Sequence, residues 1–405
     1  MVLEVVQHYF RHNTTVKAAW LDCSKAFDTC VFSILFTKIL DRGVPAIIVR
    51  GLLFIYTQQR CWVKWSANQT VSRVFGVSNS TRQGSCLSPC IFCVYLDGLL
   101  VELRDAGVGC VLGDVFVGAA CFADDLALLA PTRDGLQTML DITADYARRH
   151  NLSFSTDPIA AKSKSKAMFF HVGREPNPAP VKLCGRVLPW VERADHLGHV
   201  IHHTASQDLD CNSARGAYIG TSNEILNMFS FATAAQKLTA VQTYASAWYG
   251  SMLWSLYSDA ANKAFRSWNT TVKMACELPR HTRTYIVENY CCPLPSVRQQ
   301  ILRRYVQYVQ SLIKSDNMII CQLAHLAVNS TRSVTGRNVM EMREEFQLDP
   351  LTVNKKQFSV KKAVIPENGK ENLELLDHLI SIRNSETEEE IISEVDDLIA
   401  SVCSV

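Results

Sequence analysis

The chain has 405 residues, of which 48% are hydrophobic and 20% are charged, so it can bury a sizeable core divided among two or three domains. A formal net charge of +2 excludes a chain that is basic throughout, and any nucleic-acid groove must therefore be local. Every apolar run is shorter than the roughly 18 residues of a membrane helix, and fifteen cysteines without a secretory signal indicate free thiols in a reducing, intracellular compartment.

The first 105 residues alternate between short apolar strands and helical patterns. We expect a helix-like lead over 1–17, a strand over 18–22, and helices over about 29–40 and 46–56, the second of them packed on the sheet. Alternating residues at 61–65 and 71–77 predict a hairpin. A polar loop then precedes a helix over 89–103, with Pro89 in its first turn.

Two adjacent carboxylates, Asp124 and Asp125, lie between two apolar runs, which predicts a hairpin with the acids at its tip. Two anionic side chains held this close repel each other, and Mg²⁺ compensates them well because it prefers oxygen ligands. Taken alone, such a pair is more often a solvated surface turn. Asp22 ends the strand 102 residues upstream, and only a folded sheet could bring it to the same place.

The rest of the chain changes character twice. A helix over about 134–150, a lysine run at 162–166, a strand over 167–171 and further strands over 181–201 precede a helical region over about 208–329. Four aromatic residues are expected in the core of that region: Tyr244, Trp248, Tyr249 and Trp254. Residues 367–405 contain eleven acidic and two basic side chains, which predicts a weakly structured tail.

Three cysteines near position 90 raise the question of a zinc site. Cys90 and Cys93 have a C-x-x-C spacing, with Cys86 upstream, but no second pair follows at a ligand-like distance. The residues between them are apolar and lie on a predicted helix. We therefore expect buried free thiols that pack this helix, and no structural zinc.

The segments LDCSKAFD (21–28), RQGSCLSP (82–89) and FADD (122–125) occur in this order. They resemble motifs A, B and C of the reverse transcriptases of non-LTR (LINE-type) retrotransposons, over about 16–201 and more loosely to about 340. The resemblance implies an α+β fold, a right-hand polymerase palm in which helices back an antiparallel sheet, followed by a helical thumb-like domain. The implied domains are 1–175 (palm with a remnant of fingers), 176–205 (a primer-grip-like hairpin), 206–340 (helical thumb or connection) and 341–405 (the acidic tail).

The resemblance also implies roles for individual residues. Two Mg²⁺ ions, or Mn²⁺, would be held by Asp22, Asp124, Asp125 and the backbone carbonyl of Cys23. Lys162 would protonate the leaving pyrophosphate, with Lys164 as the alternative. Residues expected to contact template, primer or nucleotide are Phe27, Arg82, Gln83, Gly84, Leu197 and Gly198. Phe27 would act as a steric gate against a 2′-hydroxyl, although without the motif an ordinary core aromatic is about as common.

The implied function is RNA-directed DNA synthesis, in which dNTPs are joined to the 3′-hydroxyl of a DNA primer along an RNA template. Only 21 residues precede Asp22, whereas the family has a fingers domain there and often an endonuclease, so we expect a fragment of a longer element or a decayed copy. An alternative is a catalytically inactive remnant that only binds nucleic acid or a partner protein. An RNA-templated RNA polymerase is disfavoured by Phe27 and by Phe122-Ala123, because Gly-Asp-Asp is usual there. The expected location is the nucleus or cytoplasm, and the nucleus during retrotransposition if the chain is active.

Overall fold

The computed structural model describes residues 1–65, 70–77, 79–81, 85–157, 163–171, 178–288 and 294–354. The chain divides into two compact units, Met1–Ser206 and Gln207–Val405. The predicted boundaries near residues 175 and 340 stay predictions. Among the helices of the described ranges, none is both long enough and apolar enough to cross a membrane. The expected site residues Arg82, Gln83, Gly84 and Lys162, and the acidic tail from residue 355 onward, lie outside the described residues, whereas 341–346 belong to a helix.

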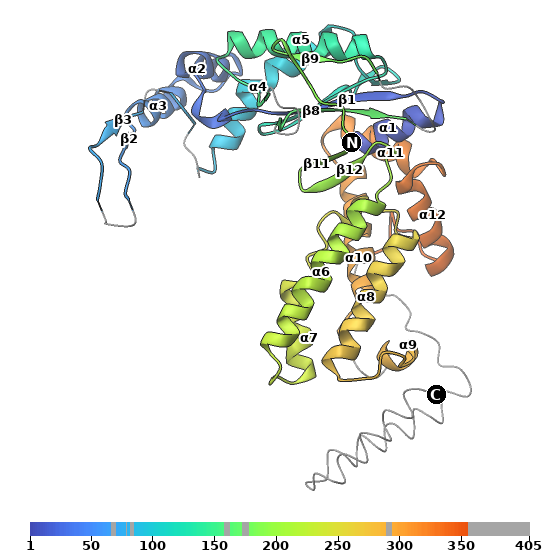
Figure 1. Cartoon of the computed structure of the whole chain (residues 1–405). Coiled ribbons are helices and arrows are strands. Elements are labelled where there is room, and N and C mark those ends of the chain that lie inside the picture. The colour runs from blue at the N-terminus through green and yellow to red at the C-terminus, as the bar shows by residue number, and fades with distance from the viewer. Residues whose placement is uncertain are drawn as a thin grey trace, which may run out of the picture. The chain divides into compact units, whose positions relative to one another are not determined.

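The first unit is built on a four-stranded antiparallel sheet with the strand order β6-β7-β1-β8 (Figure 1). Its strands are β6 (Ala119–Phe122), β7 (Asp125–Ala130), β1 (Val16–Asp22) and β8 (Lys166–Phe170). β1 lies inside the sheet, where both faces are covered, and its residues from 18 to 21 are accordingly apolar and buried without interruption.

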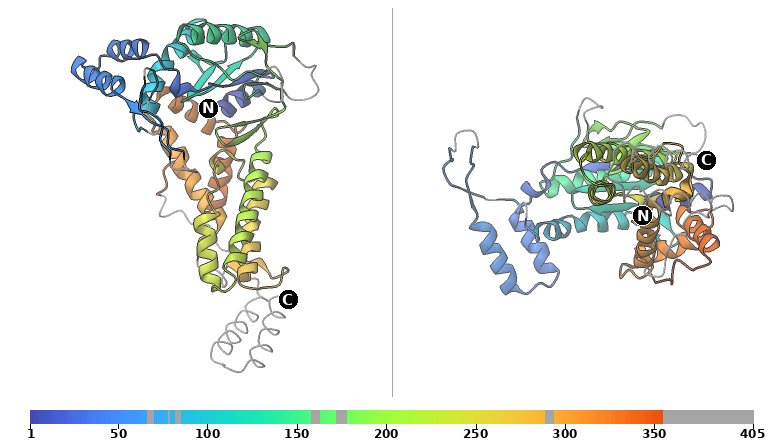
Figure 2. Two further views of the ribbon diagram at one scale, coloured as in Figure 1. Left: turned by 60° about the vertical axis from the view of Figure 1, so that its left-hand side comes forward. Right: turned by 90° about the horizontal axis from the view of Figure 1, so that it is seen from below.

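Helices cover one face of this sheet. α5 (Arg133–Arg149) packs on β1 and β7, α4 (Ser88–Asp105) packs on β6 and α5, and α2 (Phe32–Asp41) packs on α4 (Figures 1 and 2). Alternate strand residues, among them Leu21 and Leu128, enter the core on this face. This arrangement confirms the predicted α+β fold with a helix-backed antiparallel sheet.

The opposite face carries α1 (Val2–Arg11) and the hairpin of β11 (Arg193–His196) and β12 (His199–His202) (Figures 1 and 2). The ring of His196 lies 4.7 Å from that of Trp20 on β1. The 193–202 hairpin therefore packs on the face of the sheet opposite to the one that the helices cover.

A lobe projects from the helical side of the first unit. It consists of α3 (Ala46–Thr57) and the hairpin of β2 (Arg60–Cys61) and β3 (Phe75–Gly76) (Figure 1). The prediction that α3 packs on the sheet is wrong: its main neighbour is α2, where the rings of Phe32 and Phe36 lie 5.9 and 6.0 Å from Tyr56. Only Val49 and Tyr56 of α3 are buried, and these two side chains are enough to pack α3 against one neighbouring helix.

The cysteines of α4 correct another expectation. Cys86, Cys90 and Cys93 are free thiols, but they are exposed rather than buried. The buried residues of α4 recur at helical spacing from Ile91 to Leu103, which turns positions 90 and 93 away from the core.

The second unit is helical, as predicted. Its helices are α6 (Asp208–Met228), α7 (Ala234–Tyr244), α8 (Asp259–Ala275), α9 (Thr284–Ile286), α10 (Val297–Ile313), α11 (Met318–Val328) and α12 (Val334–Phe346). Trp248 and Trp254 are buried in its core, and the Trp254 indole donates a 2.8 Å hydrogen bond to Asp210. Tyr244 and Tyr249 are exposed, so their prediction as core residues is wrong. Helix α7 ends at Tyr244, and at its end the helical spacing of apolar residues no longer determines which side chains face the core.

Candidate active site

Three aspartates meet at one end of the sheet. Asp22, the last residue of β1, is the antiparallel partner of Asp125, the first residue of β7. Side chains of directly opposed residues project from the same face, with Cβ atoms about 5 Å apart. Asp124 precedes β7 in the turn, and its carbonyl oxygen accepts a 3.4 Å hydrogen bond from the amide of Cys23. The structure thus brings together the two acidic segments that are far apart in the sequence.

The register also decides which face carries the carboxylates. Leu21 and Leu126, the neighbours of Asp22 and Asp125, enter the core beneath α4 and α5. Because strand residues alternate, Asp22 and Asp125 project from the other face, the one that carries Trp20 and the 193–202 hairpin. Both aspartates are half-buried, so they remain accessible.

A tight turn holds Asp124 at the tip. The pairing of Phe122 with Asp125 leaves a two-residue loop, in which Ala123 has φ of +51°. A residue with a Cβ in this conformation costs about 1–2 kcal/mol. The thiol of Cys121 donates to the Ala123 carbonyl oxygen at 3.1 Å, and burial raises the pKa of Cys121 to about 12, which keeps the thiol a neutral donor.

The charges of this edge are unbalanced. Burial, and then the negative charges of Asp124 and Asp22, raise the pKa of Asp125. The ammonium Nζ of Lys164 lies 3.7 Å from Oδ2 of Asp22. The Lys164 side chain is 72% exposed, and an exposed ion pair of this kind contributes less than about 1 kcal/mol. A cation of higher charge could therefore replace it at Asp22.

The donor chemistry fits a hard divalent cation. Carboxylate oxygens are the ligands that Mg²⁺ prefers, and the Lys164 ammonium stands where such a charge would be needed. In the described ranges, no three His, Cys, Asp or Glu side chains are grouped so that they could hold a metal ion as they stand, so the carboxylates would have to rotate toward one another. Burial, followed by the charge of Asp124, raises the pKa of Cys23 to about 12, so its thiol is neutral here, and its carbonyl oxygen is the hard ligand that Mg²⁺ would prefer.

The backbone of Asp22 is fixed by serines that we did not predict. Directly before β8, the buried hydroxyl of Ser165 accepts a 3.2 Å hydrogen bond from the Asp22 amide. The amide of Ser155 donates to the Asp22 carbonyl oxygen at 2.8 Å, and the amide of Ser24 donates to Ser153 at the same distance. The sequence feature that could have indicated these contacts is the alternation of serine and lysine over 162–166. The described serines of this segment are buried, and Lys164 is exposed.

Comparison with known proteins decides the family. Residues 2–201, which contain all three aspartates, match the family described as reverse transcriptase (RNA-dependent DNA polymerase). Residues 2–201 therefore form a reverse transcriptase domain, which makes up just under half of the chain.

Relatives of this reverse transcriptase domain come from retrotransposable elements. Over 224 residues the chain is 30% identical to the Pol polyprotein of the type-2 element R2DM of Drosophila melanogaster, covering 52% of this chain and 20% of the relative. Over 122 residues it is 32% identical to the R2 Pol polyprotein of Nasonia vitripennis, covering 30% of this chain and 12% of the relative. The matches thus span at most a fifth of these relatives. They confirm the predicted identity as part of a non-LTR reverse transcriptase.

Among solved structures, the chain is similar to telomerase from Candida albicans in complex with a TWJ fragment of telomeric RNA. The identity is 9% and the TM-score is 0.35, over 80% of this chain and 54% of that chain. A TM-score this low supports no argument about the chain.

Two further expected residues of the reverse transcriptase domain lie at the tip of the 193–202 hairpin. Leu197 and Gly198 form its two-residue turn with φ of +50° and +77°, both in the left-handed region that such a turn requires. The hairpin is attached to the sheet through His196, on the same face as Asp22. A contact of this turn with a primer remains a prediction.

Phe27 lies in the short helix Ala26–Asp28 that follows β1, and it is half-buried. Its ring lies 5.2 Å from that of Phe92 on α4, so one side of the ring is packed. Its carbonyl oxygen accepts a 2.6 Å hydrogen bond from the amide of Thr81, which ties motif A to the described start of the motif B loop. This position is compatible with a steric gate and does not test it.

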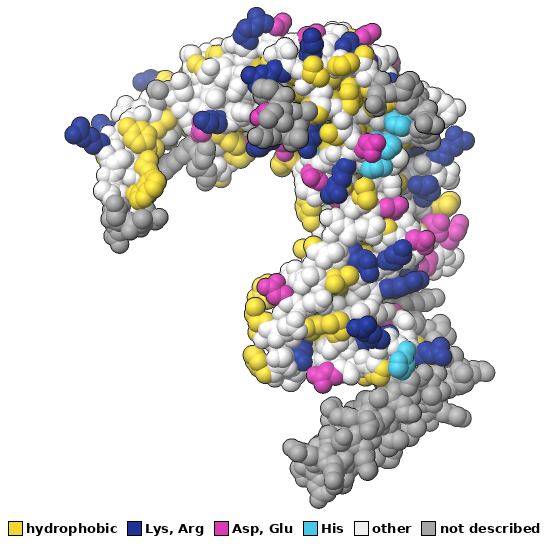
Figure 3. Space-filling view, viewed as in Figure 1, with side chains coloured by type: hydrophobic (Ala, Val, Ile, Leu, Met, Phe, Trp, Pro, Cys, Tyr) yellow, Lys and Arg dark blue, Asp and Glu magenta, His cyan; other side chains and the backbone are white. Residues whose placement is uncertain are grey.

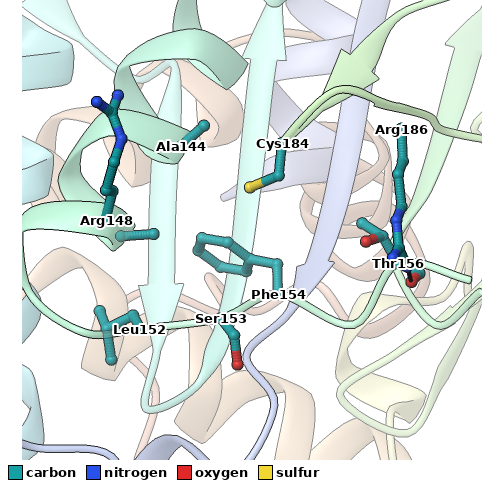
Figure 4. Close-up of a pocket in the computed structure, with 9 residues that line it drawn as sticks. Ala144, Arg148, Leu152, Ser153, Phe154, Thr156, Cys184 and Arg186 are labelled. Atoms are coloured by element: carbon teal, nitrogen blue, oxygen red, sulfur yellow. Dashed lines mark hydrogen bonds between the residues drawn. The ribbon is translucent and has the colours of Figure 1, made fainter.

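A pocket of about 530 Å³ lies beside the loop that supports Asp22 (Figure 4). It is lined by Ala144, Ala147, Arg148, Leu152, Ser153, Phe154, Thr156, Cys184 and Arg186. None of these is one of the three aspartates, and Figure 4 shows Phe154 and Cys184 facing each other across it. We do not assign the reaction to this pocket, because a duplex needs an open surface like the one that carries Asp22.

Proposed function

We propose that this reverse transcriptase domain joins deoxynucleotides to the 3′-hydroxyl of a DNA primer along an RNA template. The observation that carries the proposal is the pairing of Asp22 with Asp125 next to the turn of Asp124. The two paired aspartates and the neighbouring Asp124 lie at one accessible end of the sheet, which supports the proposal. Reverse transcriptase chemistry requires acidic groups from different segments to converge in this way.

Asp22, Asp124, Asp125 and the Cys23 carbonyl would hold two divalent ions, Mg²⁺ or Mn²⁺. When bound, such ions stabilise the attacking and leaving oxygens of an in-line displacement. The chain's own contribution is to fix the acids: the β1–β7 pairing sets their register, and Ser165 and Ser155 fix the Asp22 backbone.

A lysine and Phe27 would complete the reaction. Lys162 would deliver a proton to the leaving pyrophosphate, with Lys164, whose Nζ lies 3.7 Å from Oδ2 of Asp22, as the alternative. Phe27 would exclude a 2′-hydroxyl on the incoming sugar. The template and primer would approach the sheet face opposite α4 and α5, where the Leu197–Gly198 turn also lies.

Primer extension on an RNA template with Mg²⁺ tests the proposal. We expect extension by the chain, and a loss of at least about a hundredfold in Asp124→Asn, which removes one charge from the acid edge formed by Asp22, Asp124 and Asp125. Asp114→Asn is the matched control, because Asp114 lies exposed in the turn between β4 (Val111–Leu112) and β5 (Val115–Phe116).

If neither this chain nor a longer chain with a fingers domain extends the primer, the proposal is wrong. Retained RNA binding would then favour the inactive remnant. Extension only by the longer chain would assign the acid edge to the reaction and show that it requires the fingers.

A further inference from the structure

The segment between Asp41 and Asp97 contains no acidic residue. It includes six basic residues: Arg42, Arg50, Arg60, Lys64, Arg73 and Arg82. Four of these, Arg50, Arg60, Lys64 and Arg73, lie in the lobe of α3 and the β2–β3 hairpin, so this lobe is positively charged although the chain as a whole has a net charge of only +2. Such a segment is complementary to a polyanion and offers no carboxylate to a basic partner.

The β2–β3 hairpin in this segment exposes aromatic rings. Trp62 is 60% exposed and Trp65 is 65% exposed. The ladder continues past β2: Ser72 donates from its amide to Val63 at 2.8 Å, and Trp65 donates to Thr70 at 2.8 Å. The hairpin extends away from the sheet, and its surface carries apolar and basic side chains (Figures 1 and 3).

The pairing decides which residues share a face. Cys61 pairs with Phe75 and Lys64 with Val71, so the extra residue of this hairpin lies in its second strand and the first strand alternates regularly. Arg60, Trp62 and Lys64 therefore lie on one face, about 6.6 Å apart in succession. Trp65 lies on the other face, on the side of Val63.

An indole between two cations is suited to a single nucleic-acid strand. A base can stack on the ring, and the flanking cations can contact phosphates on either side, with little dependence on sequence. A hairpin of two strands has no core in which to bury a tryptophan, so its exposed ring is available to a partner.

We propose that the face formed by Arg60, Trp62 and Lys64 binds single-stranded RNA, with one base stacked on Trp62. The inference rests on the proposed function, since the RNA strand it would hold is the template. It adds a contact surface on the lobe, outside the acid edge.

Fluorescence anisotropy with a labelled oligouridylate of about 16 nucleotides tests this. Trp62→Ala should weaken binding roughly 5- to 150-fold, the range measured for one base stacked on one aromatic ring. Trp62→Phe should recover most of the affinity. Trp65→Ala is the matched control, equally exposed on the other face, and should change affinity less than about twofold.

Loss of a phosphate contact should also change the salt dependence of binding. Lys64→Ala should weaken binding and lower the slope of log K against log salt by about 0.7, the value for one phosphate contact on a single strand. Quenching of tryptophan fluorescence by the oligouridylate should be smaller in Trp62→Ala than in Trp65→Ala, which a merely structural defect would not produce. Circular dichroism confirms that the variants are folded.

Equal affinities of the Trp62→Ala and Trp65→Ala variants would overturn the inference. A Trp62 dependence confined to an oligodeoxythymidylate, or a change in self-association alone, would overturn it as well. Asp124→Asn separates this result from the polymerase proposal, because it should abolish extension and leave oligouridylate binding unchanged. Strand binding through Trp62, without extension by either this chain or a longer chain with a fingers domain, would keep the inference and refute the polymerase.

Discussion

The acid edge of the sheet and the β2–β3 hairpin have opposite properties. At the acid edge, three carboxylates are half-buried and fixed by strand pairing to elements far away in the sequence. On the hairpin, basic and aromatic side chains are exposed, and the strand pairing that positions them joins residues within about fifteen positions of each other. Chemistry requires atoms at defined positions, whereas holding a strand requires charge and accessible rings. The comparison therefore predicts that substitutions at the two regions affect different measurements.

The largest effect should follow from Asp22→Asn. Removing one charge from the acid edge should lower the rate of nucleotide addition by at least about a hundredfold and leave oligouridylate affinity unchanged. Asp28→Asn, in the same motif but exposed, is the control and should retain activity. Single-turnover primer extension and anisotropy measure the two quantities. A large loss of RNA affinity in Asp22→Asn would contradict the separation of the two regions.

Much of the acid edge could be predicted from the sequence, and for a definite reason. The apolar runs around Asp22 and Asp124 indicated strands, and the order of the three motifs indicated which strands must pair. The register that opposes Asp22 to Asp125 follows once one face of β1 and β7 is buried, because a slip by one residue would expose Leu21 and Leu128.

Exposure was harder to predict. The alternating pattern over 61–65 predicted the hairpin, but no local pattern tells which other elements will cover it. For the same reason Cys90 and Cys93 were expected inside and lie outside, and α3 was expected on the sheet and packs on α2. Ser165 was missed because its hydrogen bond joins residues 143 positions apart and has no motif of its own.

The second prediction concerns stability. Leu128 is fully buried in β7, and Leu128→Ala should lower the free energy of unfolding by about 2–5 kcal/mol through lost burial and a cavity. Val71 lies on the hairpin and is 54% exposed, so Val71→Ala should change it by less than about 0.5 kcal/mol. Urea denaturation of both variants measures the difference. Equal losses of unfolding free energy in the two variants would show that Val71 is packed as tightly in solution as Leu128, and the contrast between the two regions would not hold.

A smaller effect is expected for Ser165→Ala. Removing the buried hydroxyl leaves the Asp22 amide without this acceptor, which costs about 1–3 kcal/mol, and the looser carboxylate should add nucleotides about tenfold more slowly. The apparent Mg²⁺ requirement should rise. Ser155→Ala is the control, because Ser155 contacts Asp22 through its backbone amide, which alanine keeps. Comparable defects in both variants would mean that the loop, rather than the hydroxyl, positions Asp22.

The smallest effect should depend on pH and come from the 193–202 hairpin, which packs on the same face of the sheet as Asp22. Burial against Trp20, followed by the charge of His199, lowers the pKa of His196 below its ordinary value of 6.5. The unfolded chain therefore binds this proton at a higher pH than the folded chain, so the folded state loses stability as the pH falls through 6.5 toward the lower folded pKa. His196→Phe keeps a ring on Trp20 but removes this loss, so its melting temperature should fall less than that of the wild type between pH 7.5 and 5. Parallel declines in the two proteins would show that the proton is taken up elsewhere, and that the contact between Trp20 and His196 does not hold the neutral imidazole against the sheet.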